Sequence, residues 1–262
     1  MSITTVGNHL IHYEVLGRGE PVVFIHGWLG SWRYWWPSMQ ALSSRHRSFA
    51  FDLWGYGDSS KDQTSYTLPS YVEMIDQFIN QLGIMKPVTL IGHSLGAVAA
   101  LLYTNKYPEN IEKLVTVALP IEGSYLEPRL IDSDPGLILK NLGKANSFQE
   151  VDAEIRKVDQ TAVNNLAVEI AAMNLAADLV SCPRPLLMVF GDQDTIVKPP
   201  TGDLNHLRRS INNRYYIGLD TCHHFPMLQE KAKFNRLLLD FILASAELTE
   251  LTPKEYWQRR IR

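Results

Sequence analysis

The sequence contains few cysteines and no marked excess of charge of either sign. Only Cys182 and Cys222 occur among 262 residues, which excludes a disulfide framework, although these two could still form one bridge. So few thiols are typical of a reducing compartment, and we expect a cytoplasmic location. The net charge of −3 offers no basic surface, so we expect no nucleic-acid partner.

Long apolar runs and targeting signals are also absent. No run of 18 apolar residues occurs, so we expect no membrane span. The first residues have neither a basic segment nor an apolar core, and we expect no signal peptide. The dense basic cluster Arg259, Arg260 and Arg262 is interpreted as a solvated tail. No metal-ligand spacing such as H-E-x-x-H or C-x-x-C occurs, so we predict no metal and no cofactor.

Short apolar strands alternate with helical segments along most of the chain. With 45% hydrophobic and 20% charged residues, the composition is that of a globular protein. A hairpin is expected from 9 to 19. Further strands are predicted at 21–25, 48–53, 88–91, 113–118, 186–190 and 214–218, and helices at 31–42, 68–82, 95–106, 201–210, 227–246 and after Thr252. This alternation predicts an α/β fold with a mostly parallel sheet.

The alternation stops after Pro120 and resumes near Pro185. Between them we predict only helices, one opened by the capping box Ser147–Glu150 and one Ala-rich from 161 to 179. Insertions at strand ends usually serve binding. We therefore predict a core of residues 1–120 and 185–262, with a helical cap, or lid, at 121–184.

The pentapeptide Gly92-His93-Ser94-Leu95-Gly96 is the strongest functional motif. An apolar strand precedes it and a helix of small residues follows, which is the context of a nucleophile elbow. The sharp turn strains the Ser backbone and needs glycines at close approaches. The first helical turn offers N–H groups to an oxyanion.

A nucleophilic Ser needs a base and a group that orients the base. The strand 186–190 runs into Gly191–Asp194, and the strand 214–218 runs into Asp220–Pro226. Both loops follow the carboxyl ends of parallel strands, where open α/β sheets bind ligands. The sequence therefore brings Ser, Asp and His to one edge in that order, as in α/β-hydrolases.

Four further segments extend the resemblance to the α/β-hydrolase superfamily over nearly the whole chain. These are His26–Trp28, similar to the oxyanion loop; Asp52–Ser59, similar to the D-x-x-G-x-G-x-S loop; Gly191–Val197, similar to the acid loop; and His224–Pro226, similar to the histidine loop. The resemblance implies a mostly parallel eight-stranded sheet flanked by helices, with a helical cap inserted after the sixth strand.

The resemblance also implies roles for five residues. Ser94 corresponds to the nucleophile, His224 to the base and Asp194 to the acid. The backbone N–H groups of Trp28 and Leu95 correspond to the oxyanion hole.

Each role has an alternative candidate in the sequence. His223 could replace His224, and either Asp192 or Glu122 could replace Asp194. We expect His93 to pack beside the nucleophile rather than to transfer protons. We expect His26 to brace its loop through hydrogen bonds.

These residues predict a serine hydrolase that cleaves a small to medium hydrophobic carboxylic ester, or a related acyl compound, through an acyl-enzyme. We expect an apolar pocket, lined by Trp28 and by the cap residues Leu137, Ile138, Leu139, Leu142, Phe148 and 171–173. A Ser at the elbow disfavours epoxide opening and dehalogenation, which require a carboxylate nucleophile.

Other functions remain open on the same fold. One alternative is a cofactor-free non-esterase with the same triad: perhydrolase- or haloperoxidase-like, a lyase, or a synthase of the menaquinone-pathway type. A binding protein without turnover is a third. The sequence leaves the oligomeric state open.

Overall fold

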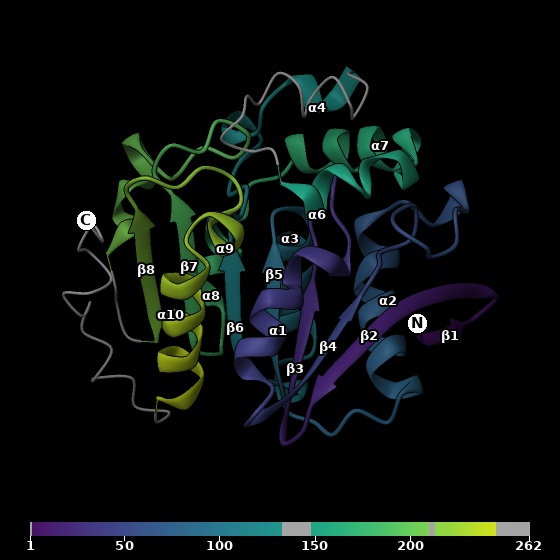
Figure 1. The fold of residues 1–262 in the computed structure, drawn as a ribbon. Helices are drawn as coiled ribbons and strands as arrows, with labels where there is room; N and C mark the ends of the chain where they lie inside the picture. The colour runs from purple at the N-terminus through teal and green to yellow at the C-terminus, as the bar shows by residue number, and fades with distance from the viewer. Residues whose placement is uncertain (1, 133–147, 210–212, 245–262) are drawn as a thin grey trace.

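The computed structural model describes residues 2–132, 148–209 and 213–244. Its eight strands form one sheet in the order β1-β2-β4-β3-β5-β6-β7-β8 (Figure 1). The strands are β1 Ser2–Val6, β2 His9–Gly17, β3 Glu20–Ile25, β4 His46–Phe51, β5 Val88–His93, β6 Ile111–Val117, β7 Leu186–Gly191 and β8 Arg214–Leu219. The β1–β2 and β2–β4 pairs are antiparallel, and all pairs from β4 to β8 are parallel. The predicted fold class is confirmed, although the sequence pattern did not predict β1.

The central strands carry continuous apolar sequences because both of their faces are covered. Every residue of β5 and β7 is buried, and β3 is exposed only at Glu20. Helices α1 and α10 cover one face of the sheet, whereas α2, α3 and α8 cover the other (Figure 1). Two-sided cover of this kind is characteristic of parallel sheets.

The described α-helices are α1 Trp36–Leu42, α2 Leu68–Gln81, α3 Leu95–Lys106, α4 Arg129–Asp132, α6 Gln149–Asp152, α7 Gln160–Ala171, α8 Ala176–Ser181, α9 Pro226–Gln229 and α10 Lys231–Leu243. Among them, none is both long and apolar enough to cross a membrane. Figure 1 shows α4, α6 and α7 above the carboxyl ends of the strands. Both cysteines are free.

Several predicted helices are shorter than expected. The helix predicted at 31–42 begins as a 3-10 turn at Trp32–Trp35, and Ser31 caps it by accepting the Arg33 N–H. The helix predicted at 201–210 is a 3-10 helix at Gly202–Arg208. The helix predicted at 227–246 divides at Glu230, whose ψ of 51° is not helical.

The helix predicted at 161–179 also breaks, for a tertiary reason. Between α7 and α8 the chain extends and pairs with the segment that leaves β6. Gly123 N–H donates to the Met173 carbonyl at 3.2 Å, and Leu175 N–H donates to the Ile121 carbonyl at 2.7 Å. These long-range bonds replace helical bonds that the local sequence would have supported.

The segment 121–184 carries helices but no named strand within its described residues. The helix predicted to open at the capping box is only the short α6, which ends at Asp152, and a 3-10 turn at Ile155–Lys157 follows it. The division into core and cap stays a prediction. Several predicted features lie outside the described residues: Ser147 of the capping box, Leu137–Leu142, the helix after Thr252 and the basic cluster at 259–262.

Candidate active site

The turn between β5 and α3 holds Ser94 in a strained conformation. Its φ of 52° and ψ of −116° lie in a region that non-glycine residues rarely adopt, at a cost of about 1–3 kcal/mol. Ser94 N–H donates to the Val117 carbonyl of the neighbouring strand at 2.8 Å, which holds the turn in place. The Ser94 Oγ is buried and has no hydrogen-bond partner within the described part of the chain. The turn thus holds an unpaired hydroxyl at the carboxyl end of β5.

Glycines allow the loop after β3 to lie directly against this turn. A Cβ on Gly96 would overlap the His26 carbonyl. A Cβ on Gly27 would lie 2.7 Å from the Ser94 Cβ, closer than real Cβ atoms approach. The loop His26–Trp28 therefore runs beside the nucleophile elbow, as the resemblance implied.

His26 orients the peptide group that carries the Trp28 N–H. The His26 Nε2 accepts the Leu53 N–H at 2.9 Å, so the proton is on Nδ1, which donates to the Gly27 carbonyl at 2.9 Å. Burial lowers the pKa of His26, which favours this neutral form. Because a trans peptide directs its C=O and N–H to opposite sides, the Trp28 N–H points away from His26. The predicted bracing role of His26 is confirmed.

Asp194 and His224 form a buried hydrogen-bonded pair. The His224 Nδ1 lies 2.8 Å from the Asp194 Oδ2. The other carboxylate oxygen accepts the N–H groups of Ile196 at 2.8 Å and Val197 at 3.0 Å. With both oxygens occupied, Asp194 holds the ring with its proton on Nδ1, which leaves Nε2 as the nitrogen that can accept a proton.

The two alternative acids, Asp192 and Glu122, have other partners among the described contacts. Asp192 pairs with Arg208 at 2.9 Å, and burial raises the pKa of its carboxyl group. Glu122 accepts a hydrogen bond from the Asn174 side chain at 2.8 Å.

His93 brings the histidine loop to the elbow. The ring centroids of His93 and His224 are 4.6 Å apart, and the His93 Nε2 lies 2.8 Å from the His224 carbonyl oxygen. The predicted packing of His93 beside Ser94 agrees with this contact. Sequence reasoning missed Tyr34, whose hydroxyl lies 2.9 Å from the His93 Nδ1. Its only signal was its place in the aromatic segment after the oxyanion loop.

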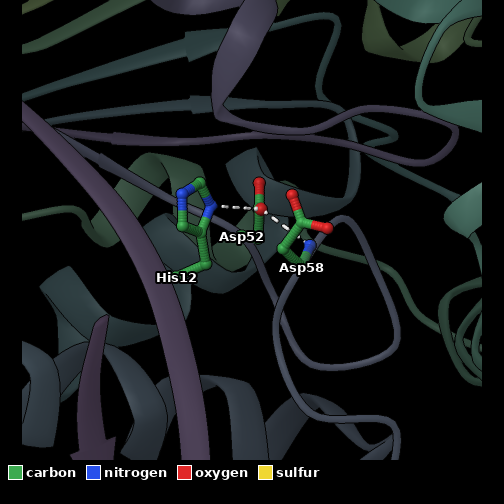
Figure 2. A group of neighbouring side chains, drawn as sticks. All are labelled: His12, Asp52 and Asp58. Carbon is green, nitrogen blue, oxygen red and sulfur yellow. Dashed lines mark hydrogen bonds and ion pairs between the residues drawn. The ribbon is translucent and has the colours of Figure 1, made fainter. Parts of the chain in front are cut away.

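A second histidine–carboxylate group lies where β2 pairs with the end of β4, with His12 in β2 and Asp52 directly after β4 (Figure 2). Ligand atoms of His12, Asp52 and Asp58 lie within 4.8 Å of one another, as a metal site requires. However, the Asp52 Oδ2 already accepts His12 Nδ1–H at 2.9 Å and the Asp58 N–H at 3.0 Å. The Asp58 carboxylate also pairs with Lys157 at 2.9 Å. These occupied oxygens favour a loop brace over a metal centre.

Comparison with known proteins places this geometry in a family. The model of the alpha/beta hydrolase fold matches residues 20–152, slightly more than half of the chain. A probable lysophospholipase, BODYGUARD 3 from Arabidopsis thaliana, is 40% identical over 106 residues, which are 38% of this chain and 21% of that protein. The chain thus matches only about a fifth of that relative's length.

Other relatives match over nearly the whole chain. The pimeloyl-[acyl-carrier protein] methyl ester esterase of Vibrio cholerae is 24% identical, over 88% of this chain and 97% of that protein. A crystal structure of bromoperoxidase from Bacillus anthracis superimposes with a TM-score of 0.80 at 22% identity, over 93% and 99% of the two chains. At that identity the likeness shows the fold alone. The family match and the elbow geometry together show that the chain belongs to the α/β-hydrolase fold family.

Proposed function

We propose that the chain is a serine hydrolase that cleaves a small to medium hydrophobic carboxylic ester, or a related acyl compound, through an acyl-enzyme. One observation carries the proposal. The buried Ser94 hydroxyl has no partner among the described residues, and it stands on a strained elbow directly after His93, whose ring centroid lies 4.6 Å from that of His224. Asp194 holds the His224 ring at 2.8 Å. A hydroxyl, a base and an orienting carboxylate are the parts that acyl transfer requires.

In the first step, the Ser94 Oγ attacks the carbonyl carbon and its proton passes to the His224 Nε2. Asp194 stabilises the imidazolium that forms. The carbonyl oxygen becomes an oxyanion and accepts the N–H groups of Trp28 and Leu95. Leu95 is the first residue of α3, where backbone N–H groups lack helical partners. The carbon–oxygen bond to the alcohol then breaks, and the alcohol leaves with the proton from Nε2.

In the second step, His224 takes a proton from water as the water oxygen bonds to the acyl carbon. The bond to the Ser94 Oγ breaks, and Oγ recovers its proton from His224. The products are a carboxylic acid and an alcohol, and the enzyme returns to its starting state.

Aromatic side chains next to the histidine loop support a hydrophobic acyl group. Phe225 follows the proposed base and contacts Phe148 edge to face at 5.8 Å between ring centroids. The Trp28 side chain is buried in the oxyanion loop. Apolar side chains at this place suit a hydrophobic substrate.

The test is hydrolysis of a panel of p-nitrophenyl esters, thioesters and lactones by the full chain and by Ser94→Ala. We expect the variant to lose about 10⁶-fold in kcat while its circular dichroism is unchanged. A fluorophosphonate should label the wild-type protein at Ser94 in a peptide-resolved mass spectrum. Substantial turnover by folded Ser94→Ala would refute the proposal.

A further inference from the structure

Three loops of the candidate site meet at one buried pair of side chains, Tyr34 and His93. Gly27 N–H donates to the Tyr34 hydroxyl at 2.5 Å, and that hydroxyl lies 2.9 Å from the His93 Nδ1. On the opposite side of the ring, the His93 Nε2 lies 2.8 Å from the His224 carbonyl oxygen. The chain of contacts begins in the oxyanion loop, passes the elbow and ends in the histidine loop.

The donors and acceptors in this series of three hydrogen bonds allow one arrangement of protons. A carbonyl oxygen only accepts, so the His93 Nε2 must carry a proton and donate to His224. In a neutral ring, Nδ1 then accepts, and the Tyr34 O–H must donate to it. The Tyr34 oxygen in turn accepts the Gly27 N–H. Each group fills its role once, and reversing one bond would leave a buried group unpaired.

The surroundings favour a neutral His93. Its ring is fully buried and contacts Tyr34, Trp35, His224 and Phe225, with centroid distances from 4.6 to 6.4 Å. Burial lowers the pKa of His93 well below its ordinary value. A neutral ring does not reverse its hydrogen bonds as pH changes, so the three loops keep one spacing.

Glycine at position 30 leaves space for the Tyr34 ring. A Cβ on Gly30 would overlap the Tyr34 ring, so the turn after the oxyanion loop needs glycine there. The Tyr34 ring also contacts Phe225 at a centroid distance of 6.0 Å.

We propose that Tyr34 and His93 are positioning residues, which fix the oxyanion donors and the base relative to Ser94 through this chain of three hydrogen bonds. The inference rests on the proposed serine hydrolase function. Neither residue takes or gives a proton in the reaction. Their effect comes from geometry, since a small misplacement of reacting groups costs about 100-fold in rate.

Tyr34→Phe tests the inference because it removes one oxygen and keeps the ring. We expect kcat on a p-nitrophenyl ester to fall about 10- to 100-fold, with KM changed less than about threefold. Tyr103→Phe is the matched control. Tyr103 is equally buried, and its hydroxyl bonds to Asp76 at 3.0 Å and Asn110 at 3.1 Å instead. The control should lose comparable stability and keep the wild-type kcat.

His93 variants separate a specific hydrogen bond from general packing. His93→Gln can still place an N–H near the His224 carbonyl, whereas His93→Leu cannot, so Gln should retain more activity than Leu. The double variant Tyr34→Phe, His93→Leu should have a kcat little lower than that of the less active single variant, because both substitutions break the same series of hydrogen bonds. Independent, multiplying losses would overturn the inference. So would a Tyr34→Phe kcat within about twofold of Tyr103→Phe.

A readout independent of turnover distinguishes failure of the inference from failure of the proposed function. In full-length protein labelled with ¹⁵N-histidine, the His93 ring should show the Nε2–H tautomer from pH 6 to 8. The His224 ring shifts should change in Tyr34→Phe and stay constant in Tyr103→Phe. A wild-type protein without Ser94-dependent turnover would defeat the proposed function. Unchanged His224 shifts in Tyr34→Phe would defeat the positioning role.

Discussion

Two buried histidine–aspartate pairs in this molecule have nearly the same local geometry. Nδ1 lies 2.8 Å from the carboxylate in the His224–Asp194 pair and 2.9 Å in the His12–Asp52 pair. Both carboxylates also accept backbone N–H groups: from Ile196 and Val197 at Asp194, and from Trp32 and Asp58 at Asp52. Distances within a pair therefore do not by themselves assign a catalytic role to either one.

The two pairs lie in different parts of the fold. His224 lies in the loop bonded to His93, beside the strained turn of Ser94. The His12 Nε2 faces Glu14, 3.7 Å from its carboxylate. The hydrogen bond that His12 donates to Asp52 raises the pKa of His12, and burial opposes this only in part. The comparison teaches that a His–Asp bond does not by itself assign a catalytic role to a histidine; the proposed role of His224 depends on its place beside the elbow.

The largest difference should appear when each histidine is replaced by glutamine. Without the proposed base, His224→Gln should lose about 10⁶-fold in kcat, as such triads do. His12→Gln should keep kcat within about tenfold and lose stability instead, since it leaves the Asp52 carboxylate short of a buried donor. Ester hydrolysis and urea unfolding of both variants measure this contrast. Equal kcat losses would break the comparison.

Replacing Asp194 should also lower kcat, but by less than replacing His224. Asp194→Asn should lower kcat by about 10⁴-fold, because an amide NH₂ facing Nδ1 favours the wrong ring tautomer. Its fold, followed by circular dichroism, should persist. A kcat within tenfold of wild type would point to a different acid, and Glu122→Gln in the same assay is the control.

The free energy of unfolding should depend on pH through His12. His12 has a raised pKa in the folded state, so its extra stabilisation is full below about pH 6.5 and is lost as pH rises through the raised value. The unfolding free energy lost in His12→Gln should therefore be larger at pH 6 than at pH 9. Urea titrations at the two pH values test this, and a constant difference would contradict it. Burial lowers the pKa of His26 and His93, so their contributions to stability change with pH in the opposite sense. Both residues are present in the wild type and in His12→Gln, so these contributions cancel when the two unfolding free energies are subtracted.

The smallest effect concerns Lys157, which pairs with Asp58 at 2.9 Å beside the His12–Asp52 pair. Both side chains are about one-third exposed. Asp58→Asn removes only this exposed pair, because Lys157 keeps its second partner, the Glu154 carboxylate, at 3.3 Å. It should therefore lower the unfolding free energy by less than about 1 kcal/mol. Adding zinc to either protein should leave the melting temperature unchanged, because the Asp52 oxygens already bind protein N–H groups. A zinc-dependent rise that His12→Gln abolishes would instead reveal a metal centre.

Local patterns in the sequence were sufficient to predict most of the framework. Buried strands need continuous apolar residues, and the elbow needs glycines on both sides of Ser94, so both are encoded within a few residues. The resemblance indicated Asp194 and His224, and the structure brings these two together. Their catalytic roles, and those of Trp28 and Leu95, remain part of the proposed function.

Tertiary contacts decided what local patterns could not. The Ala-rich helix breaks at 172–175 because residues 121–123 pair with it from about 50 positions away. Tyr34 bonds to His93 across 59 positions, and His12 bonds to Asp52 across 40. A residue's intrinsic preference acts over one helical turn or one strand pleat. Which distant donor reaches which buried acceptor depends on how the whole sheet and its loops pack, and only the folded structure contains that information.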